Sequence, residues 1–179
     1  MERERDKTFR GNAGQFFVAG ELCRRGYSAV VTLGNTPNVD VLCSNKAGTK
    51  FVHIQVKTFR PGSKTCTVGA KAEQDFGPSF FWVLAGIPSP ASNVPFDYYV
   101  IPCKEMAVNV SLAHRLWLER PGKEGQAHKD SKVRTVYLPP HQSETGWNIS
   151  KYRNRWDLIE QKIKAETRAK VDRTMGRVA

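Results

Sequence analysis

The sequence contains neither a long hydrophobic segment nor a cysteine pattern that would hold a metal. No apolar run reaches the roughly 18 residues that a membrane-spanning helix needs. The four cysteines are widely separated, without a CxxC pair or a zinc-ligand spacing, which is typical of free thiols inside the cell. The charged segment MERERDK at the start does not resemble a secretory signal. We therefore expect a cytoplasmic protein with no membrane partner.

Histidine and acidic residues are both scarce. The four histidines lie too far apart in the sequence to suggest an HNH or zinc-dependent nuclease site. Asp and Glu number 17 against 28 Lys and Arg, which gives a formal net charge of +11. This excess favours nucleic acid over a membrane as the partner, because no basic helix here has a sufficiently apolar opposite face. The alternative is that the charge serves only solubility.

The length and the hydrophobic pattern indicate one domain. A chain of 179 residues can bury a hydrophobic core without disulfides or a structural metal. We expect a charged flexible N-terminus over residues 1–10, a single domain over residues 11–170 and a basic tail over residues 171–179. The sequence shows no internal repeat and no low-complexity segment that would divide it further.

The order of the expected elements indicates an α/β fold, with a mixed, partly antiparallel sheet flanked by helices. Helices are expected over residues 12–25 and 103–119. A basic C-terminal helix is expected over about residues 148–170, with an apolar seam that packs on the domain or on a second subunit. Strands are expected at residues 27–33, 38–44, 51–59, 65–70, 80–86, 96–102 and 133–138. Residues 80–86 are apolar throughout, which predicts a central strand.

The most informative segment, residues 38–59, is typical of a β-hairpin. Its turn contains Gly48, a residue free to adopt a positive φ. With the turn centred between residues 47 and 48, partners across the two strands have numbers that sum to 95. A slip by one residue would mix apolar and polar side chains, so the hydrophobic pattern selects this register. The register puts six apolar residues on one face: Val39, Val41, Cys43, Val52, Ile54 and Val56.

The same register brings three polar side chains together on the opposite face. Asp40 is placed directly across from Gln55, and Lys57 lies one pleat further on. A carboxylate and an amide carbonyl are hard oxygen ligands of the kind that Mg²⁺ accepts, with water and substrate phosphate completing its coordination. A lysine beside them would orient or deprotonate an attacking water, or stabilise charge on a phosphate. The alternative is a solvated cross-strand ion pair beside a surface amide.

This arrangement resembles the active-site pattern of the PD-(D/E)xK phosphodiesterase superfamily, which includes restriction enzymes, Holliday-junction resolvases and some homing endonucleases. Asp40 matches the first acid of the pattern, Gln55 the second acid and Lys57 the lysine, and the resemblance covers about residues 11–103. Glutamine at the second position also occurs in one branch of homing endonucleases and in bacterial relatives with a QVK strand. The resemblance implies a restriction-endonuclease-like core in which Asp40, Gln55 and the Val56 carbonyl hold Mg²⁺ or Mn²⁺.

Residues 11–27 resemble the first helix of the same superfamily, where many members carry a further acid. That position is occupied here by Gln15, and Glu21 lies two turns later. Either side chain is a candidate for the site, although Glu21 is also placed to form ion pairs with Arg24 and Arg25 within the helix.

The resulting site is poor in negative charge. Asp40 is its one anionic ligand unless Glu21, Glu73 or Asp75 contributes. Magnesium sites often combine one or two carboxylates with substrate phosphate, so the substrate would supply the missing anionic oxygens.

The sequence thus predicts a Mg²⁺-dependent endonuclease that hydrolyses phosphodiester bonds in double-stranded or branched DNA. Two alternatives stay open: a catalytically inactive nucleic-acid-binding module on the same fold, and a basic domain that binds an acidic protein. A homodimer is a further possibility, because cutting both strands commonly requires two sites. The basic residues expected to contact nucleic acid are Arg60, Lys64, Lys151, Arg153 and Arg155.

Overall fold

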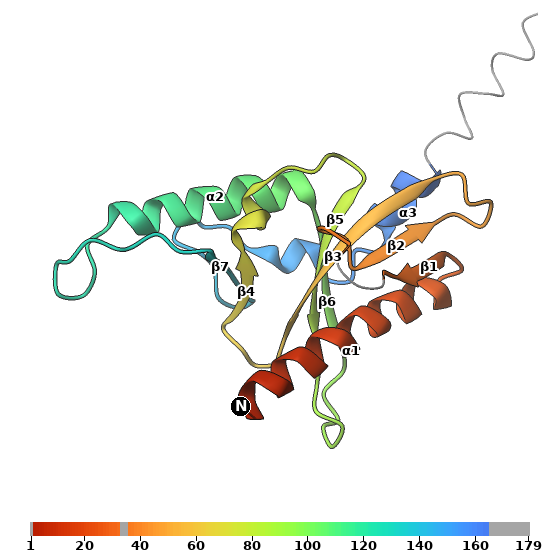
Figure 1. Ribbon diagram of the computed structural model, residues 1–179, viewed down its shortest axis with the longest axis horizontal. Coiled ribbons are helices and arrows are strands. Elements are labelled where there is room, and N and C mark those ends of the chain that lie inside the picture. Colours follow the sequence, from red (N-terminus) through yellow and green to blue (C-terminus); the bar gives the residue numbers. More distant parts are fainter. Residues whose placement is uncertain (1, 33–35, 165–179) are drawn as a thin grey trace, which may run out of the picture.

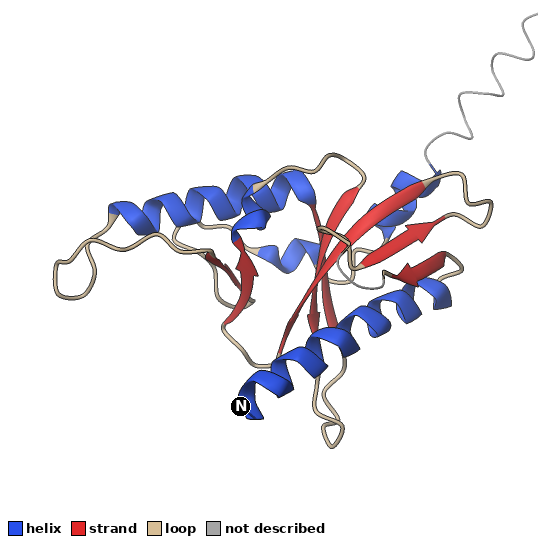
Figure 2. Ribbon diagram, in the orientation of Figure 1, coloured by secondary structure: helices blue, strands red, loops and turns tan. Residues whose placement is uncertain are grey.

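The computed structural model describes residues 2–32 and 36–164, with side chains described from residue 7 onward. The main sheet has the strand order β1-β2-β3-β5-β6, in which β3 and β5 are parallel and the other neighbours are antiparallel. Figures 1 and 2 show this sheet flanked by helices, so the prediction of a mixed α/β fold is confirmed. Its strands are β1 (Ser28–Val31), β2 (Val41–Ser44), β3 (Phe51–Phe59), β5 (Phe80–Gly86) and β6 (Asp97–Pro102).

Helices cover both faces of the main sheet. On one face, α1 (Glu2–Arg24) and α3 (Asp157–Lys164) pack over alternate residues of β2, β3 and β5. On the other face lie α2 (Cys103–Glu119) and the short 3₁₀ helices η1 (Ala70–Glu73) and η2 (Ile149–Tyr152). All seven residues of β5 are buried, because this strand lies inside the sheet between two hydrophobic clusters. The prediction of a central strand at residues 80–86 is therefore confirmed.

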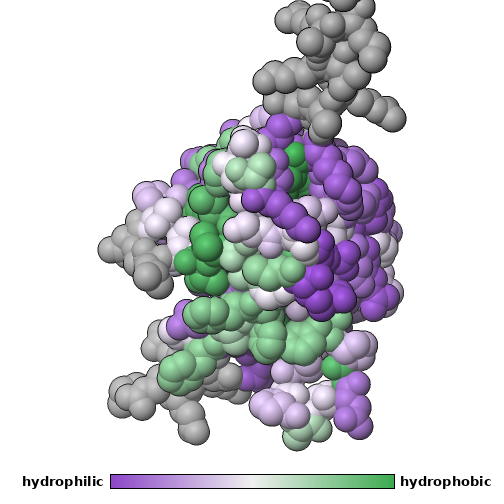
Figure 3. All heavy atoms as spheres, turned by 90° about the vertical axis from the view of Figure 1, so that its right-hand side faces the viewer, coloured by the Kyte–Doolittle hydropathy of each residue, from purple (hydrophilic) through white to green (hydrophobic). Residues whose placement is uncertain are grey.

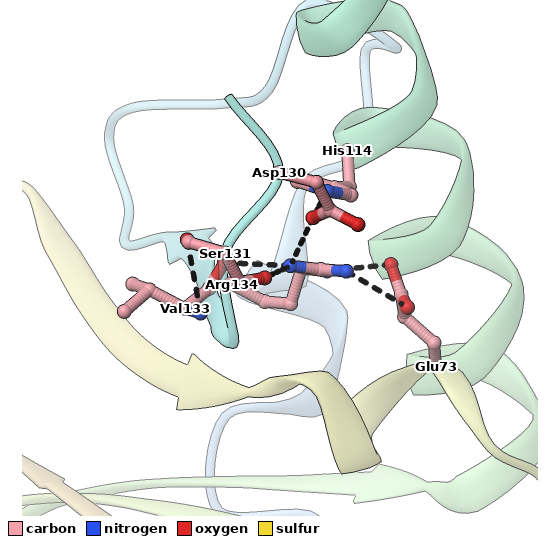
Figure 4. A network of polar contacts seen from close by, with 6 residues as sticks. All are labelled: Glu73, His114, Asp130, Ser131, Val133 and Arg134. Carbon is pink, nitrogen blue, oxygen red and sulfur yellow. Dashed lines mark hydrogen bonds and ion pairs between the residues drawn. The ribbon is translucent and has the colours of Figure 1, made fainter. Parts of the chain in front are cut away.

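A second, two-stranded sheet lies beside the main one, formed by β4 (Thr65–Gly69) and β7 (Val133–Tyr137). A charged network connects it to η1 and α2. The guanidinium of Arg134, almost fully buried, is bound bidentately by Glu73 at 2.6 and 3.2 Å and also contacts Asp130, which binds His114 (Figure 4). A buried guanidinium needs such partners, since an unpaired charge in the interior costs several kcal/mol.

Two predicted boundaries are wrong. Residues 2–10, expected to form a flexible N-terminus, belong to α1, which begins at Glu2 rather than at residue 12. The expected C-terminal helix over residues 148–170 is interrupted: η2 ends at Tyr152 and α3 begins at Asp157. Its apolar seam divides at this interruption, because η2 packs on one face of the sheet and α3 on the other. Residues 165–170 and the predicted tail at 171–179 lie outside the described residues.

The predicted hairpin register is confirmed along β2 and β3. Val41 is paired with Ile54 and Cys43 with Val52, which gives the expected sum of 95. Gly48 has φ +64°, as its place in the turn requires. The register fails at the start of the hairpin, where Val39 packs against the hydrophobic cluster on the opposite face from Val41. Asn38, with φ +65°, turns the chain there before β2 begins.

Among the described residues, no helix is both long and apolar enough to cross a membrane.

Candidate active site

Asp40 directly precedes β2, at the point where the pairing of β2 with β3 ends while β3 continues beside β5. Its backbone N–H donates to the Ile54 carbonyl at 2.9 Å, although Ile54 is the cross-strand partner of Val41 in the hairpin register. Its carboxylate then accepts two hydrogen bonds from β3: one from the Val56 N–H at 2.7 Å and one from the Gln55 side-chain amide. Asp40 and Gln55 are therefore in direct contact, as the register predicts.

On its β2 side this end of β3 has no strand partner among the described residues and forms the open edge of β3, while β5 pairs with it on the other side. Strand β2 pairs with β3 only between residues 51 and 54, whereas β3 continues to Phe59. The N–H and C=O of one strand residue point to the same side of the strand. Since the Val56 N–H points to Asp40, the Val56 carbonyl also faces this edge. Three oxygen-bearing groups, the Asp40 carboxylate, the Gln55 amide and the Val56 carbonyl, are thus adjacent.

The electrostatics of Asp40 combine opposing effects. Burial raises the pKa of its carboxyl group above the ordinary value, while the hydrogen bond from Val56 and the nearby charge of Lys57 act in the opposite direction. Lys57 is only partly exposed and occupies the same face of β3 as Gln55. A cation beside a partly buried carboxylate is the electrostatic arrangement that the sequence predicts for this site.

Helix α1 approaches the open edge of β3 through Gly14. A Cβ atom at this position would lie within 3.0 Å of the Thr58 side chain, so only glycine permits the observed approach. Gln15 follows directly and is partly exposed, one residue from this contact. One turn earlier lies Arg10. Burial raises the pKa of the Cys66 thiol to about 12, while the charges of Lys57 and Arg10 act in the opposite direction.

Arg10, four positions before Gly14 on α1, lies outside the domain bounds that the sequence predicts. The sequence predicts that residues 1–10 precede the folded domain, and this prediction assigns Arg10 to no helix face. The sequence did contain one usable signal, because Phe9, Ala13, Phe16 and Phe17 continue the helical spacing across residue 10.

The other candidate acids have partners of their own. The Glu21 carboxylate is bound by Arg24 and Arg25, each at 2.8 Å, and these contacts lower its pKa. The ion-pair alternative for Glu21 is thus the arrangement observed. Glu73 binds Arg134 on the far side of the second sheet, and Asp75 accepts a hydrogen bond from the Gly77 N–H at 2.9 Å. Asp40 is the carboxylate that contacts Gln55 at the β3 edge.

The predicted nucleic-acid-binding residues fall into two groups. Arg60 and Lys64 are exposed in the segment that follows β3, close in sequence to Lys57. The remaining three form surface ion pairs: Lys151 with Glu105, Arg153 with Asp97 and Arg155 with Asp157. An exposed ion pair of this kind contributes roughly 0–1 kcal/mol to stability. A phosphate group could therefore replace the acidic partner at little cost.

The residues at the β3 edge fit a hard divalent cation, although with little negative charge. The Asp40 carboxylate, the Gln55 amide and the Val56 carbonyl all offer oxygen atoms, which Mg²⁺ and Mn²⁺ prefer. The Asn38 side-chain oxygen, two residues before Asp40, is buried without a hydrogen-bond partner among the described residues. Within the part of the chain that the structure describes, however, no three His, Cys, Asp or Glu side chains converge as a metal-binding group. A cation here would rely on amide, carbonyl and substrate oxygens.

Comparison with known proteins identifies the fold. No protein-family model and no curated protein sequence matches the chain. Among solved structures, the bacterial homing endonuclease I-Ssp6803I matches with a TM-score of 0.50 and 17% identity, over 89% of this chain and 96% of that one. Hjc, a Holliday junction resolvase from the archaeal hyperthermophile Archaeoglobus fulgidus, matches with a TM-score of 0.40 and 17% identity, over 71% and 83%. The match to I-Ssp6803I shows that the chain shares the fold of that protein.

Proposed function

We propose that this protein is a divalent-metal-dependent DNA endonuclease that hydrolyses phosphodiester bonds at the open edge of β3. The observation that supports the proposal most directly is the contact of Asp40 with both Gln55 and the Val56 N–H, beside Lys57. The fold shared with a homing endonuclease and the net charge of +11 support it further.

Each residue of the site has a role that its position allows. Asp40, Gln55 and the Val56 carbonyl would hold Mg²⁺ or Mn²⁺, which activates water and neutralises charge on the phosphate. Lys57 holds the attacking water in line with the scissile phosphate and stabilises the negative charge that develops there. The Gln55 side chain, which donates to Asp40, would present its amide oxygen to the cation if its terminal amide rotated. Gln15 follows Gly14, the residue of α1 that approaches β3, and would bind substrate or water from this position.

A second candidate function is a nucleic-acid-binding module that has lost catalysis. The specific observation in its favour is the single carboxylate at the β3 edge, where the related pattern has two acids. With fewer anionic ligands, cation affinity is weaker, and binding of DNA would proceed without a metal.

Cleavage of supercoiled, linear and branched DNA, with Mg²⁺, with Mn²⁺ and with EDTA, distinguishes the two functions. We expect metal-dependent cleavage that Asp40→Asn and Lys57→Ala each reduce by about 10²–10³-fold, the loss typical of removing one charge-stabilising group from an active site. DNA affinity of the Asp40→Asn protein in EDTA should stay near that of the wild type.

Matched substitutions away from the site serve as controls. Asp75→Asn retains an acceptor for the Gly77 N–H, and Lys46→Ala removes an exposed charge from the hairpin turn. Both proteins should cleave at the wild-type rate. If the wild type cleaves no substrate with either metal and binds DNA equally well in EDTA, the endonuclease proposal is wrong and the binding module is favoured.

A further inference from the structure

A groove runs between α1 and the loop that joins β5 to β6. Its volume is about 1010 Å³, and its walls include Phe9, Arg10 and Phe17 of α1, Arg60 after β3, and Phe96 before β6. The groove therefore combines two guanidinium groups with three aromatic rings.

The aromatic residues of this groove are unusually accessible. Phe9 is 68% exposed, Phe17 43% and Phe96 40%, although three phenylalanines in one region would ordinarily be buried. Phe17 and Phe96 contact each other with ring centroids 4.6 Å apart, which joins the two walls. Figure 3 shows a band of apolar surface across the lower half of the side view, at the height of α1 in Figure 1. Exposed apolar patches of this kind mark binding surfaces.

One wall of the groove begins directly after the proposed active site in the chain. Arg60 follows Lys57 by three residues, a distance of about 10 Å along an extended strand. Arg10 lines the same groove from α1. A strand of DNA held at Lys57 and extended toward Arg60 would enter the groove.

We propose that this groove binds a single-stranded segment of the DNA substrate next to the scissile phosphate. Arg10 and Arg60 contact the backbone phosphates, and the rings of Phe9, Phe17 and Phe96 contact the unpaired bases. The inference rests on the proposed function and narrows it, because it names substrates with a flap, a gap or a branch as the preferred class.

The chemistry of the lining favours single strands over duplex DNA and over a protein partner. Aromatic rings in a cationic groove are the arrangement with which proteins hold single strands, since any unpaired base has a face that can stack. In duplex DNA these faces are covered by neighbouring base pairs. Two arginines at the groove walls would instead oppose the docking of a second copy of this cationic chain.

Binding of a fluorescein-labelled 12-nucleotide single strand, followed by fluorescence anisotropy in EDTA, tests the inference apart from catalysis. We use the Asp40→Asn protein as background so that no substrate is cut. We expect Phe9→Ala and Arg10→Ala each to weaken single-strand binding by about tenfold, the effect of losing one stacked base or one phosphate contact. Binding of blunt duplex DNA should change less than threefold with Phe9→Ala.

Matched controls separate this effect from general loss of charge or apolar surface. Lys7→Ala removes a cation from the same exposed helix, and Val108→Ala removes an exposed apolar side chain from α2. Neither should alter single-strand binding by more than about twofold. Photocrosslinking of an iodouracil-substituted single strand, read by mass spectrometry, should label Phe9, Phe17 or Phe96.

Two results would overturn the inference. One is equal single-strand affinity in the wild type, Phe9→Ala and Arg10→Ala proteins, with crosslinks outside the groove. The other is a dimer of the wild type that Phe9→Ala converts to a monomer in sedimentation velocity, which would assign the groove to self-association. Metal-dependent cleavage that persists in either case would leave the endonuclease proposal standing.

Discussion

At the scale of single residues, Asp40 is held in an environment that opposes its own charge. Burial favours the neutral carboxyl group, whereas the Val56 N–H and Lys57 favour the carboxylate. Sites of this kind are costly to the folded protein and are retained where a charge is needed for function. The residue should therefore contribute to activity at the expense of stability.

Asp40→Asn should accordingly raise the Tm of the metal-free protein near neutral pH. Asparagine still offers an oxygen to the Val56 N–H but carries no charge that burial would penalise. Because burial raises the folded pKa of Asp40 above its unfolded value, the penalty is fully present above the folded pKa and absent below the unfolded value of roughly 3.9. The Tm difference between variant and wild type should thus be largest at pH 7–8 and shrink toward pH 4.

Thermal unfolding of both proteins across this pH range in EDTA measures the difference. Asp75→Asn, at an exposed position, is the control for the removal of an aspartate charge. A lower Tm of Asp40→Asn at every pH would mean that the attraction to Lys57 outweighs burial.

Gln55 determines how much negative charge the site offers to a cation. We expect Gln55→Glu to lower the free energy of unfolding by about 1–3 kcal/mol in EDTA, because Asp40 loses a hydrogen-bond donor and gains a repelling carboxylate. Millimolar Mg²⁺ should stabilise this variant more than it stabilises the wild type, since a cation bound only to the folded state raises stability with its affinity. Urea unfolding with and without Mg²⁺ is the measurement, and Gln74→Glu is the exposed control. Equal Mg²⁺ effects in the two proteins would argue against a cation between residues 40 and 55.

At the scale of elements, the site depends on how closely α1 approaches β3. Gly14 permits this approach, and its neighbours Gln15 and Arg10 are positioned by it. Toward the N-terminus from this contact, α1 lines the groove with Phe9 and Arg10.

Gly14→Ala should destabilise the protein by about 1–3 kcal/mol, because the added methyl group would collide with Thr58 across the α1–β3 contact. Gly20→Ala is the matched control on the same helix: no atom lies within 4 Å of its added Cβ, and the change should stabilise the helix by about 0.5–1 kcal/mol. Thr58→Ser, which removes the colliding methyl group, should recover most of the loss in the double variant. A double-mutant cycle by urea unfolding reports the coupling. Additive effects of the two substitutions would mean that the contact is not tight.

At the scale of the whole molecule, the net charge of +11 should dominate affinity for nucleic acid. If six or more phosphates are neutralised, the binding constant should fall by about 10³-fold or more between 50 and 200 mM salt, because bound counterions are released on association. Anisotropy titrations at four salt concentrations give the slope. Lys64→Ala should reduce its magnitude by about 0.7–0.9 through the loss of one phosphate contact, whereas Phe9→Ala should leave it unchanged. A slope near zero would favour the alternative in which the charge serves solubility.

Local sequence patterns were sufficient for much of the fold and for the centre of the site. The alternation of apolar residues determined the pairing of Val41 with Ile54, and this register brings Asp40 near Gln55, although the strand pairing itself ends at Val41. The uniformly apolar residues 80–86 indicated the central strand for the same reason: side-chain periodicity and burial are linked residue by residue.

Contacts between distant segments determined the features that sequence reasoning missed. The pairing of β4 with β7 joins residues more than 60 positions apart, and no local period encodes it. The close approach of Gly14 to Thr58, which brings α1 against β3, depends on two elements packing together. The open edge at Val56 exists because β2 is shorter than β3, so the geometry of the site depends on where pairing ends in three dimensions.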